Sequence, residues 1–256
     1  NGDYSLIFDG ESNEVKISGG EFISGNEPRS ISVWVFPYPS DNVSNIVSLG
    51  SGLTSDARFS IFIESDNQLR IVGQTNDFFT GYSLPDNQLT HLVVTADSTT
   101  VKFYADGVFI NQASKSYNTD ASMPIMLGTN PDCFNSEYFN GTIDDVIITR
   151  DILTTEEVSS LYYGNDIALD NLVASYNFNT GEGDIVFDQS GNDNDKLFYA
   201  ATDFFLSMHK TNRTIRMYDA RDTSDDATFN GSTLTLNTWT HIAMERYNGT
   251  VRLYIN

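Results

Sequence analysis

The stretch Leu89-Thr90-His91-Leu92, followed by Thr100-Val101-Lys102-Phe103-Tyr104-Ala105-Asp106, is the most informative part of this chain. It recurs as Trp239-Thr240-His241-Ile242 and Thr250-Val251-Arg252-Leu253-Tyr254-Ile255-Asn256, with each residue 150 positions after its counterpart. Solenoid repeats have roughly 20–50 residues, so this repeat is too long for a solenoid and has the size of a domain. We therefore expect one complete domain followed by a related, incomplete copy.

The sequence around this repeat predicts β-strands joined by tight turns. Ile31-Ser32-Val33-Trp34-Val35-Phe36 has the alternating, β-rich character of a strand, and residues 58–63 and 68–72 read the same way. Asp106-Gly107, between two apolar runs, is typical of a hairpin turn. Many short strands with regular turns predict an all-β fold, an antiparallel jelly-roll β-sandwich.

One short helix is expected near residue 154. Thr154-Thr155-Glu156-Glu157 has the pattern of a capping box, in which the Thr and the second Glu satisfy each other's backbone N–H groups. Val158, Leu161 and Tyr162 then fall on one helical face, and Gly164 can end the helix. This helix is expected to close the first domain.

The composition limits the kinds of partner. Of the 256 residues, 39% are hydrophobic and 19% charged, which is enough for a packed core. Thirty-five acidic residues against fourteen basic ones give a net charge of −21. This charge argues against a nucleic-acid partner, which requires many Lys and Arg contacts, and it favours cations. No apolar run approaches the roughly 20 residues of a membrane-spanning helix, so membrane insertion is not expected.

Cysteine use and the chain ends also carry information. Cys133 is the only cysteine, so no internal disulfide can form. This fits a microbial or viral chain better than a disulfide-stapled animal module. The chain begins at Asn1 without Met, and we expect a fragment, a mature form or the ordered part of a longer polypeptide.

Taken in order, these motifs resemble the laminin-G-like domains of the concanavalin A-like lectin/glucanase superfamily. The resemblance covers residues 2–164 and includes the Thr-His-Leu strand with its hairpin. The other segments that carry it are Leu6-Ile7-Phe8-Asp9-Gly10, Ser32-Val33-Trp34-Val35, Ile125-Met126-Leu127-Gly128 and Phe139-Asn140-Gly141-Thr142-Ile143-Asp144-Asp145-Val146-Ile147-Ile148. The resemblance implies a concanavalin A-like sandwich.

The two domains are expected over residues 1–164 and 165–256. Residues 172–187 resemble the opening strand of the second laminin-G-like sandwich, although they are also able to complete the first one. Only ten residues separate Asp195 from Phe205, so the second copy is either degenerate or lacks a segment near residues 196–203. It is truncated at residue 256, in the middle of its hairpin.

No catalytic site is predicted. The related glucanases carry two glutamates, in the order Glu-x-Asp-x-x-Glu or Glu-x-Asp-x-Glu, as a retaining pair. Glu64-Ser65-Asp66 begins this pattern, but Gln68 and Leu69 stand where the second glutamate would fall. His91 and His241 occupy equivalent strand positions and are interpreted as structural hydrogen-bonding residues. Neither a zinc-type Cys/His spacing nor a nucleotide-binding glycine motif occurs.

A calcium site is a further expectation from the resemblance. Calcium prefers six to eight oxygen ligands, and Asp144-Asp145 resembles the acidic pair of the family. Asp188 and Asn192, in a turn, are the other candidate ligands. The alternative is an ordinary acidic strand edge, which discourages pairing with another sheet.

Two groups of loop residues are candidates for sugar contact, because aromatic faces stack on sugar rings and Asn or Asp side chains bond hydroxyl groups. The alternative is that these residues cover the edge of the core. The candidates are Phe78, Phe79 and Tyr82 in the first group and Asn130, Asp132, Phe134 and Tyr138 in the second.

The expected function is that of a non-catalytic adhesion or structural module, extracellular or on a cell or virion surface, such as a phage fibre. It would contact glycans or neighbouring protein subunits through its loops, within a larger multidomain or multimeric assembly. Tandem copies favour multivalent attachment. Two alternatives stay open: a purely structural spacer in a filament or capsid lattice, and an accessory carbohydrate-binding domain of a larger glycan-degrading enzyme.

Overall fold

The computed structural model describes residues 4–18, 22–132, 137–179, 185–192 and 194, together with the backbone of the strands between residues 196 and 255. The chain forms two compact units, Asn1–Ala201 and Thr202–Asn256. Among the described residues, no helix has both the length and the apolar composition needed to cross a membrane.

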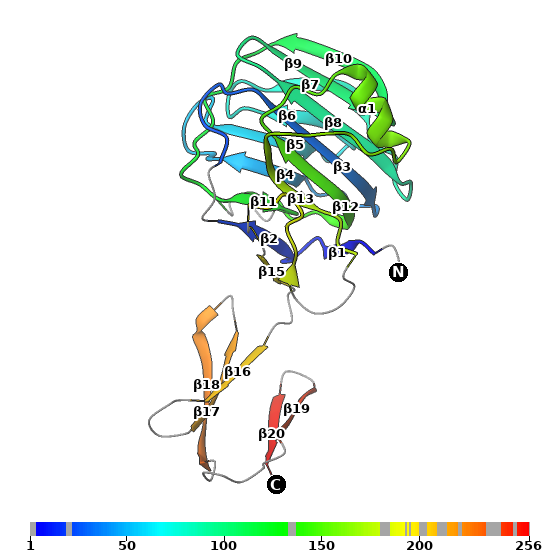
Figure 1. Ribbon diagram of the computed structural model, residues 1–256. Coiled ribbons are helices and arrows are strands. Elements are labelled where there is room, and N and C mark those ends of the chain that lie inside the picture. Colours follow the sequence, from blue (N-terminus) through cyan, green and yellow to red (C-terminus); the bar gives the residue numbers. More distant parts are fainter. Residues whose placement is uncertain are drawn as a thin grey trace. The chain divides into compact units, whose positions relative to one another are not determined.

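The first unit is a sandwich of two antiparallel sheets (Figure 1). One sheet has seven strands in the order β1-β12-β3-β8-β9-β10, and β13 also pairs with β12. Its strands are β1 (Leu6–Asp9), β3 (Arg29–Pro37), β8 (Thr90–Ala96), β9 (Thr100–Ala105), β10 (Val108–Ser114), β12 (Asn140–Thr149) and β13 (Leu172–Tyr176).

The other sheet has eight strands in the order β14-β15-β2-β11-β4-β5-β6-β7. Its strands are β2 (Glu14–Ile17), β4 (Ser44–Gly50), β5 (Arg58–Ile63), β6 (Gln68–Val72), β7 (Phe78–Ser83), β11 (Ile125–Leu127), β14 (Ile185–Val186) and β15 (Lys196–Tyr199). The two sheets confirm the expected all-β sandwich.

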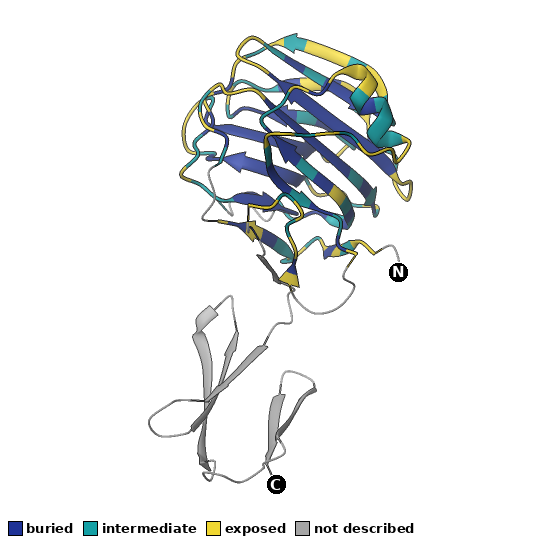
Figure 2. Ribbon diagram, viewed as in Figure 1, coloured by how far each residue is buried: buried dark blue, intermediate teal, exposed yellow. Residues whose placement is uncertain are grey.

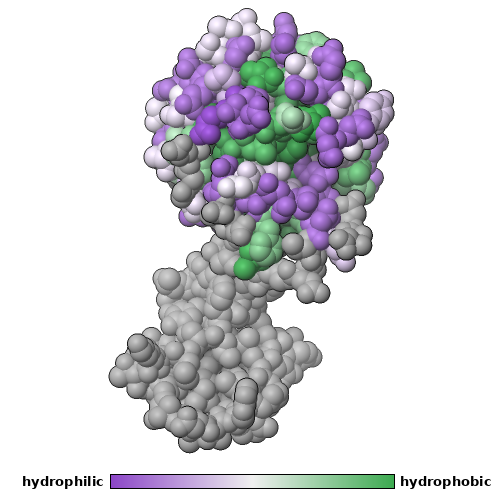
Figure 3. Space-filling model, in the orientation of Figure 1, coloured by the Kyte–Doolittle hydropathy of each residue, from purple (hydrophilic) through white to green (hydrophobic). Residues whose placement is uncertain are grey.

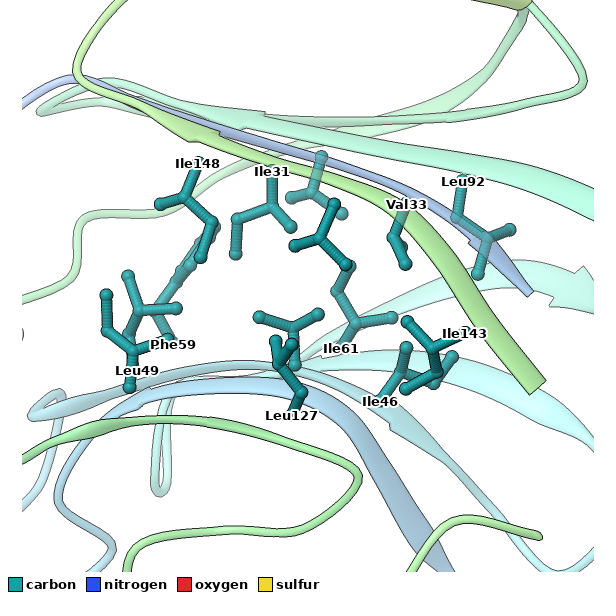
Figure 4. Packing of buried hydrophobic residues seen from close by; sticks show 14 of the residues in the cluster. Ile31, Val33, Ile46, Leu49, Phe59, Ile61, Leu92, Leu127, Ile143 and Ile148 are labelled. Carbon is teal, nitrogen blue, oxygen red and sulfur yellow. The ribbon is translucent and has the colours of Figure 1, made fainter. Parts of the chain in front are cut away.

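The hydrophobic core lies between the two sheets, and buried residues follow the facing strands (Figure 2). Ile31 and Val33 from β3 point toward Phe59 and Ile61 from β5 (Figure 4), and all four side chains have no exposed surface. Side chains alternate along a strand, so Trp34 lies on the outer face of the seven-stranded sheet. This outer face carries the helix.

The helix α1 (Thr155–Tyr162) is capped as expected. Thr154 Oγ1 accepts a hydrogen bond from the backbone N–H of Glu157, and the Glu157 carboxylate accepts one from the backbone N–H of Thr154. The helix covers the outer face because Val158 packs with Val93 and Tyr104 of the seven-stranded sheet. The predicted helix and its capping box are confirmed.

The first unit extends past the division expected after residue 164. β13 pairs with β12, placing Ser175 opposite Ile147, and β15 pairs with β2, placing Phe198 opposite Val15. β3 pairs along one edge of β12, and β1 pairs with only the first half of the other edge. β13 pairs with the second half and satisfies the hydrogen-bonding groups there. Residues 172–176 therefore complete the first sandwich, and the boundary lies near residue 201.

The second unit contains a three-stranded sheet, β16-β17-β18, and the hairpin β19-β20. Its strands are β16 (Phe204–Met208), β17 (Thr214–Asp219), β18 (Asp222–Thr233), β19 (Ile242–Tyr247) and β20 (Thr250–Ile255). The repeated stretch forms the same hairpin twice, because Leu92 pairs with Ala105 and Ile242 pairs with Ile255.

A second laminin-G-like sandwich over residues 165–256 stays a prediction. So does the missing segment near residues 196–203, a range that holds β15 and residues outside the described part of the chain.

Candidate functional site

A cleft of about 200 Å³ lies on the outer face of the seven-stranded sheet, beside α1 and the segment that follows it. Each neighbouring element contributes a side chain with hydrogen-bonding or aromatic character. These residues are Trp34 from β3, His91 from β8, Asp145 from β12, Asn165 and Asp166 after α1, and Asn177 after β13. Figure 3 shows apolar residues gathered near the middle of the visible face of the first unit, with hydrophilic residues around them.

Three aromatic rings form a cluster, of which Trp34 and His91 line the cleft. Strand pairing places Trp34 directly opposite His91, and their ring centroids are 4.9 Å apart. Tyr162, in the last turn of α1, stacks on Trp34 with a centroid distance of 5.7 Å and an interplanar angle of 18°. The helix thus brings an aromatic ring from far along the chain against the two strand residues.

His91 is buried, with 1% of its surface exposed, and its two ring nitrogens differ. Nε2 lies 2.8 Å from Ser32 Oγ, which is the kind of hydrogen bond expected of a structural histidine. Nδ1 is buried and has no hydrogen-bond partner. Burial lowers the pKa of His91 to about 4, so the ring is neutral at physiological pH. A buried polar atom without a partner is unfavourable.

Asp145 reaches the cleft through an irregularity in β12. The pairing of β12 with β3 shifts register between Asp144 and Ile147, and Asp145 has a positive φ of 44°. Its backbone N–H donates to Asp144 Oδ1 at 2.8 Å. Such bulges redirect side chains and are common near functional sites, so strict alternation along this strand does not hold at the acidic pair.

The predicted ligands Asp188 and Asn192 stabilise a turn. The Asp188 carboxylate accepts hydrogen bonds from the backbone N–H groups of Ser175, Ser190 and Asn194, at 2.9, 2.9 and 3.2 Å. Asn192 Nδ2 donates to a backbone carbonyl of β13 at 2.7 Å. Both side chains therefore hold the turn against β13, next to the cleft residue Asn177.

The four predicted calcium ligands thus form two pairs, one on β12 and one in the turn. Among the described residues, no group of three or more His, Cys, Asp or Glu side chains is arranged to hold a metal ion. Calcium binding stays a prediction, and Asp144 and Asp145 are its better-placed candidates.

The first predicted aromatic group is divided by the fold. Phe78 is a core residue with 5% exposure, and Tyr82 packs against Phe103 with a centroid distance of 5.8 Å. Phe79 is 63% exposed, and the Arg70 guanidinium lies 5.5 Å from its ring centroid. Only Phe79 of this group presents an open aromatic surface.

The second predicted group belongs mostly to a polar network over the eight-stranded sheet. Asn130 is 1% exposed and donates to Glu137 at 2.7 Å, while Asp132 accepts from the backbone N–H of Gly52. Arg58 lies 3.5 Å from Glu137. Tyr138 is partly buried, and Phe134 lies outside the described residues. These contacts favour the structural role that was the alternative for Asn130 and Asp132.

Sequence reasoning did not select Trp34, Asn165, Asp166 or Asn177 as site residues. Trp34 carried a usable signal, since it alternates with core residues and so lies on the outer face of its strand. The three loop residues gave no local signal, because only the packing of α1 and β13 brings them beside Trp34.

The sequence model of the family described as the concanavalin A-like lectin/glucanases superfamily matches residues 9–159, more than half of the chain. The chain belongs to this superfamily. The resemblance seen in the sequence is thereby confirmed.

Two solved structures illustrate what this superfamily member is similar to. A protein from Bacteroides ovatus ATCC 8483 with a suggested role in carbohydrate binding is 16% identical, with a TM-score of 0.61, over 75% of this chain and 57% of that chain. The native heptameric SAP-like pentraxin from Limulus polyphemus is 15% identical, with a TM-score of 0.51, over 64% and 83%.

At these identities the similarity shows the fold alone, and the chain matches little more than half the length of the first protein. No curated protein sequence matches the chain.

Proposed function

We propose that this chain is a non-catalytic glycan-binding domain of an extracellular or surface protein, and that it holds a sugar residue in the cleft beside α1. The observation that carries this proposal is the combination of the partly exposed Trp34 ring with the buried, unpartnered Nδ1 of His91 in one cleft. Asp145, Asn165 and Asn177 add oxygen and amide groups.

These groups suit a sugar for a physical reason. The C–H face of a sugar ring packs on an aromatic side chain, while its hydroxyl groups need hydrogen-bond partners when they leave water. Small-molecule sites usually combine an apolar lining with a few placed polar groups. The relationship to a superfamily of lectins and glucanases, and the fold shared with a protein of suggested carbohydrate-binding role, support the same proposal.

Binding without catalysis is the better proposal for this cleft. Glycoside hydrolysis uses two carboxylates held on either side of the bond that breaks. Asp145 and Asp166 both line the cleft, but both are exposed, and Asp166 lies in the irregular segment after α1. Glu64, which begins the glucanase-like pattern, pairs with Arg70 at 2.8 Å.

A cleft-blocking variant tests the proposal. The full chain is first screened on a glycan array, and the best ligand is then titrated by calorimetry. Ser175→Tyr places a bulky ring in the cleft from β13, since Ser175 lines it and is partly exposed. We expect at least a tenfold loss of affinity. Ser83→Tyr, on the exposed end of β7 and away from the cleft, is the matched control and keeps the wild-type affinity.

Equal binding by both variants, with equal thermal stability, would place the sugar elsewhere. Phe79 would then be the next position to substitute, because it is the exposed aromatic of the predicted groups.

One observation favours an additional role in assembly. β10 is an edge strand of the seven-stranded sheet, carries no charged residue, and exposes Val108 and Phe109 by 61% and 43%. Uncharged edge strands readily pair with other chains. Sedimentation analysis of the full chain and of Val108→Lys tests this role, and a monomer at all concentrations would contradict it. The two alternative functions, a structural spacer and an accessory domain of an enzyme, depend on what surrounds this chain, and both stay proposals.

A further inference from the structure

We infer that the cleft selects its ligand by charge and that its preferred occupant is an amino sugar residue carrying a protonated amine. This inference rests on the proposed glycan-binding function and names the chemical class of the ligand. It is carried by three features of the cleft: its charges, its rings and its buried histidine.

The charge of the lining is negative. Asp145 and Asp166 line the cleft, and among the described residues no Lys or Arg lines it. Arg150, directly after β12, lies 3.8 Å from Glu27. Charges interact more strongly near a protein surface than in bulk water. A carboxylated or sulfated sugar would be repelled by this lining, whereas an ammonium group would be attracted.

The aromatic rings favour the same charge. Trp34 lines the cleft and is partly exposed, and Tyr162 stacks on it at a centroid distance of 5.7 Å. An ammonium group within about 6 Å of a Trp or Tyr ring is attracted by the negative face of the ring. The rings and the two carboxylates thus act on a cation in the same direction.

The buried end of the cleft adds a neutral contact. His91 is uncharged, and its Nδ1 has no hydrogen-bond partner. A sugar hydroxyl can donate to or accept from this nitrogen, depending on the ring tautomer set by Ser32. His91 is 1% exposed, while Asp145 and Asp166 are exposed. The inferred amino sugar therefore directs a hydroxyl group to the buried His91 end of the cleft and its ammonium group to the exposed carboxylates.

The size of the cleft restricts the occupant to one residue. Its volume of about 200 Å³ is below the roughly 300–1,000 Å³ of sites for drug-sized ligands. A single sugar residue, such as the end of a chain, fits this volume better than an oligosaccharide lying along a groove.

Three monosaccharides that differ in charge test the inference. Glucosamine, glucose and glucuronate are titrated against the full chain by ligand-observed NMR, in a mildly acidic buffer that keeps the amine protonated. We expect glucosamine to bind about threefold to tenfold more tightly than glucose, and glucuronate to bind most weakly. Added salt should reduce the advantage of glucosamine, because the carboxylates at the rim are exposed to solvent.

Asp145→Asn and Asp166→Asn assign the effect to the two carboxylates. Asn tolerates the positive φ of 44° at Asp145, so this variant removes the charge without straining the backbone. Each variant should reduce the preference for glucosamine over glucose, and the double variant should abolish it. Asp41→Asn, at an exposed loop position away from the cleft, removes the same charge and should leave the preference unchanged.

The possible failures can be told apart. If none of the three sugars binds, this inference is overturned, while the proposed function is decided separately by the glycan array and the Ser175→Tyr variant. If they bind with equal affinity, or glucuronate binds best, charge selection is overturned while sugar binding stands. A preference that persists in the double variant shows that the carboxylates do not cause it, which also overturns the inference.

Discussion

His91 Nε2 lies 2.8 Å from Ser32 Oγ, and both side chains are buried on the outer face of the seven-stranded sheet. Burial lowers the pKa of His91 from 6.5 to about 4. Between these values the unfolded chain binds more protons than the folded chain, so the free energy of unfolding falls as the pH drops through this window. The expected loss from this residue is about 3 kcal/mol.

Urea unfolding at about pH 7 and at about pH 4.5 measures this loss. In His91→Gln, which can still bond Ser32 but does not titrate, the loss between the two pH values should be smaller than in the wild type. The carboxylates contribute equally to the loss of unfolding free energy in both proteins, so their contribution cancels when the two losses are compared. An equal loss in the two proteins would show that His91 is not responsible.

Asp188 holds the turn after β14 against β13. Asp188→Ala removes the acceptor of several hydrogen bonds and leaves their donors without this partner. We expect the free energy of unfolding to fall by about 2–3 kcal/mol. Asp170→Ala, which removes the same charge at an exposed position, should change it by less than about 0.5 kcal/mol. Equal effects in chemical denaturation would contradict this role for the turn.

Gly128 is required because of both its backbone conformation and its surroundings. It has a φ of 81°, and an added Cβ would overlap the buried ring of Phe8. We expect Gly128→Ala to cost about 3 kcal/mol or more. Gly164 has a similar φ of 71° with nothing within 4 Å of the Cβ position, so Gly164→Ala should cost only about 1 kcal/mol. The difference between the melting temperatures of Gly128→Ala and Gly164→Ala measures the effect of the clash with Phe8, because both variants carry the backbone strain.

Calcium binding, predicted from the sequence, is tested by thermal melting with added calcium and with chelator. If Asp144 and Asp145 bind calcium, the melting temperature should rise with calcium concentration, because a ligand that binds only the folded state stabilises it. Asp144→Asn should remove the effect, while Asp97→Asn, in the distant β8–β9 turn, should retain it. A melting temperature that is unchanged by both calcium and chelator contradicts the prediction.

Local sequence signals predicted the elements of the first unit well. The capping box at Thr154 and Glu157 appears as expected, because its two hydrogen bonds join residues three positions apart. The β8–β9 hairpin and its counterpart β19–β20 in the second unit have the same strand register for the same reason. In each case the interaction depends on neighbouring residues.

Candidate site residues were less predictable. Phe78 and Phe79 are adjacent in the sequence, yet Phe78 is in the core and Phe79 is 63% exposed. Asp145 lines the cleft because of a register shift that strand alternation does not predict. Asn130 looked available for a ligand but is bonded to Glu137 within a buried network.

The sequence by itself determined the superfamily, the two-sheet sandwich and the repeated hairpin, because alternating apolar residues and turn residues act over short distances. The tertiary structure decided that β13 completes the first sandwich, that Trp34, His91 and Asp145 line one cleft, and that Tyr162 stacks on Trp34. These residues come from three strands and a helix, and only the pairing of the strands and the packing of α1 on the outer face bring their side chains together.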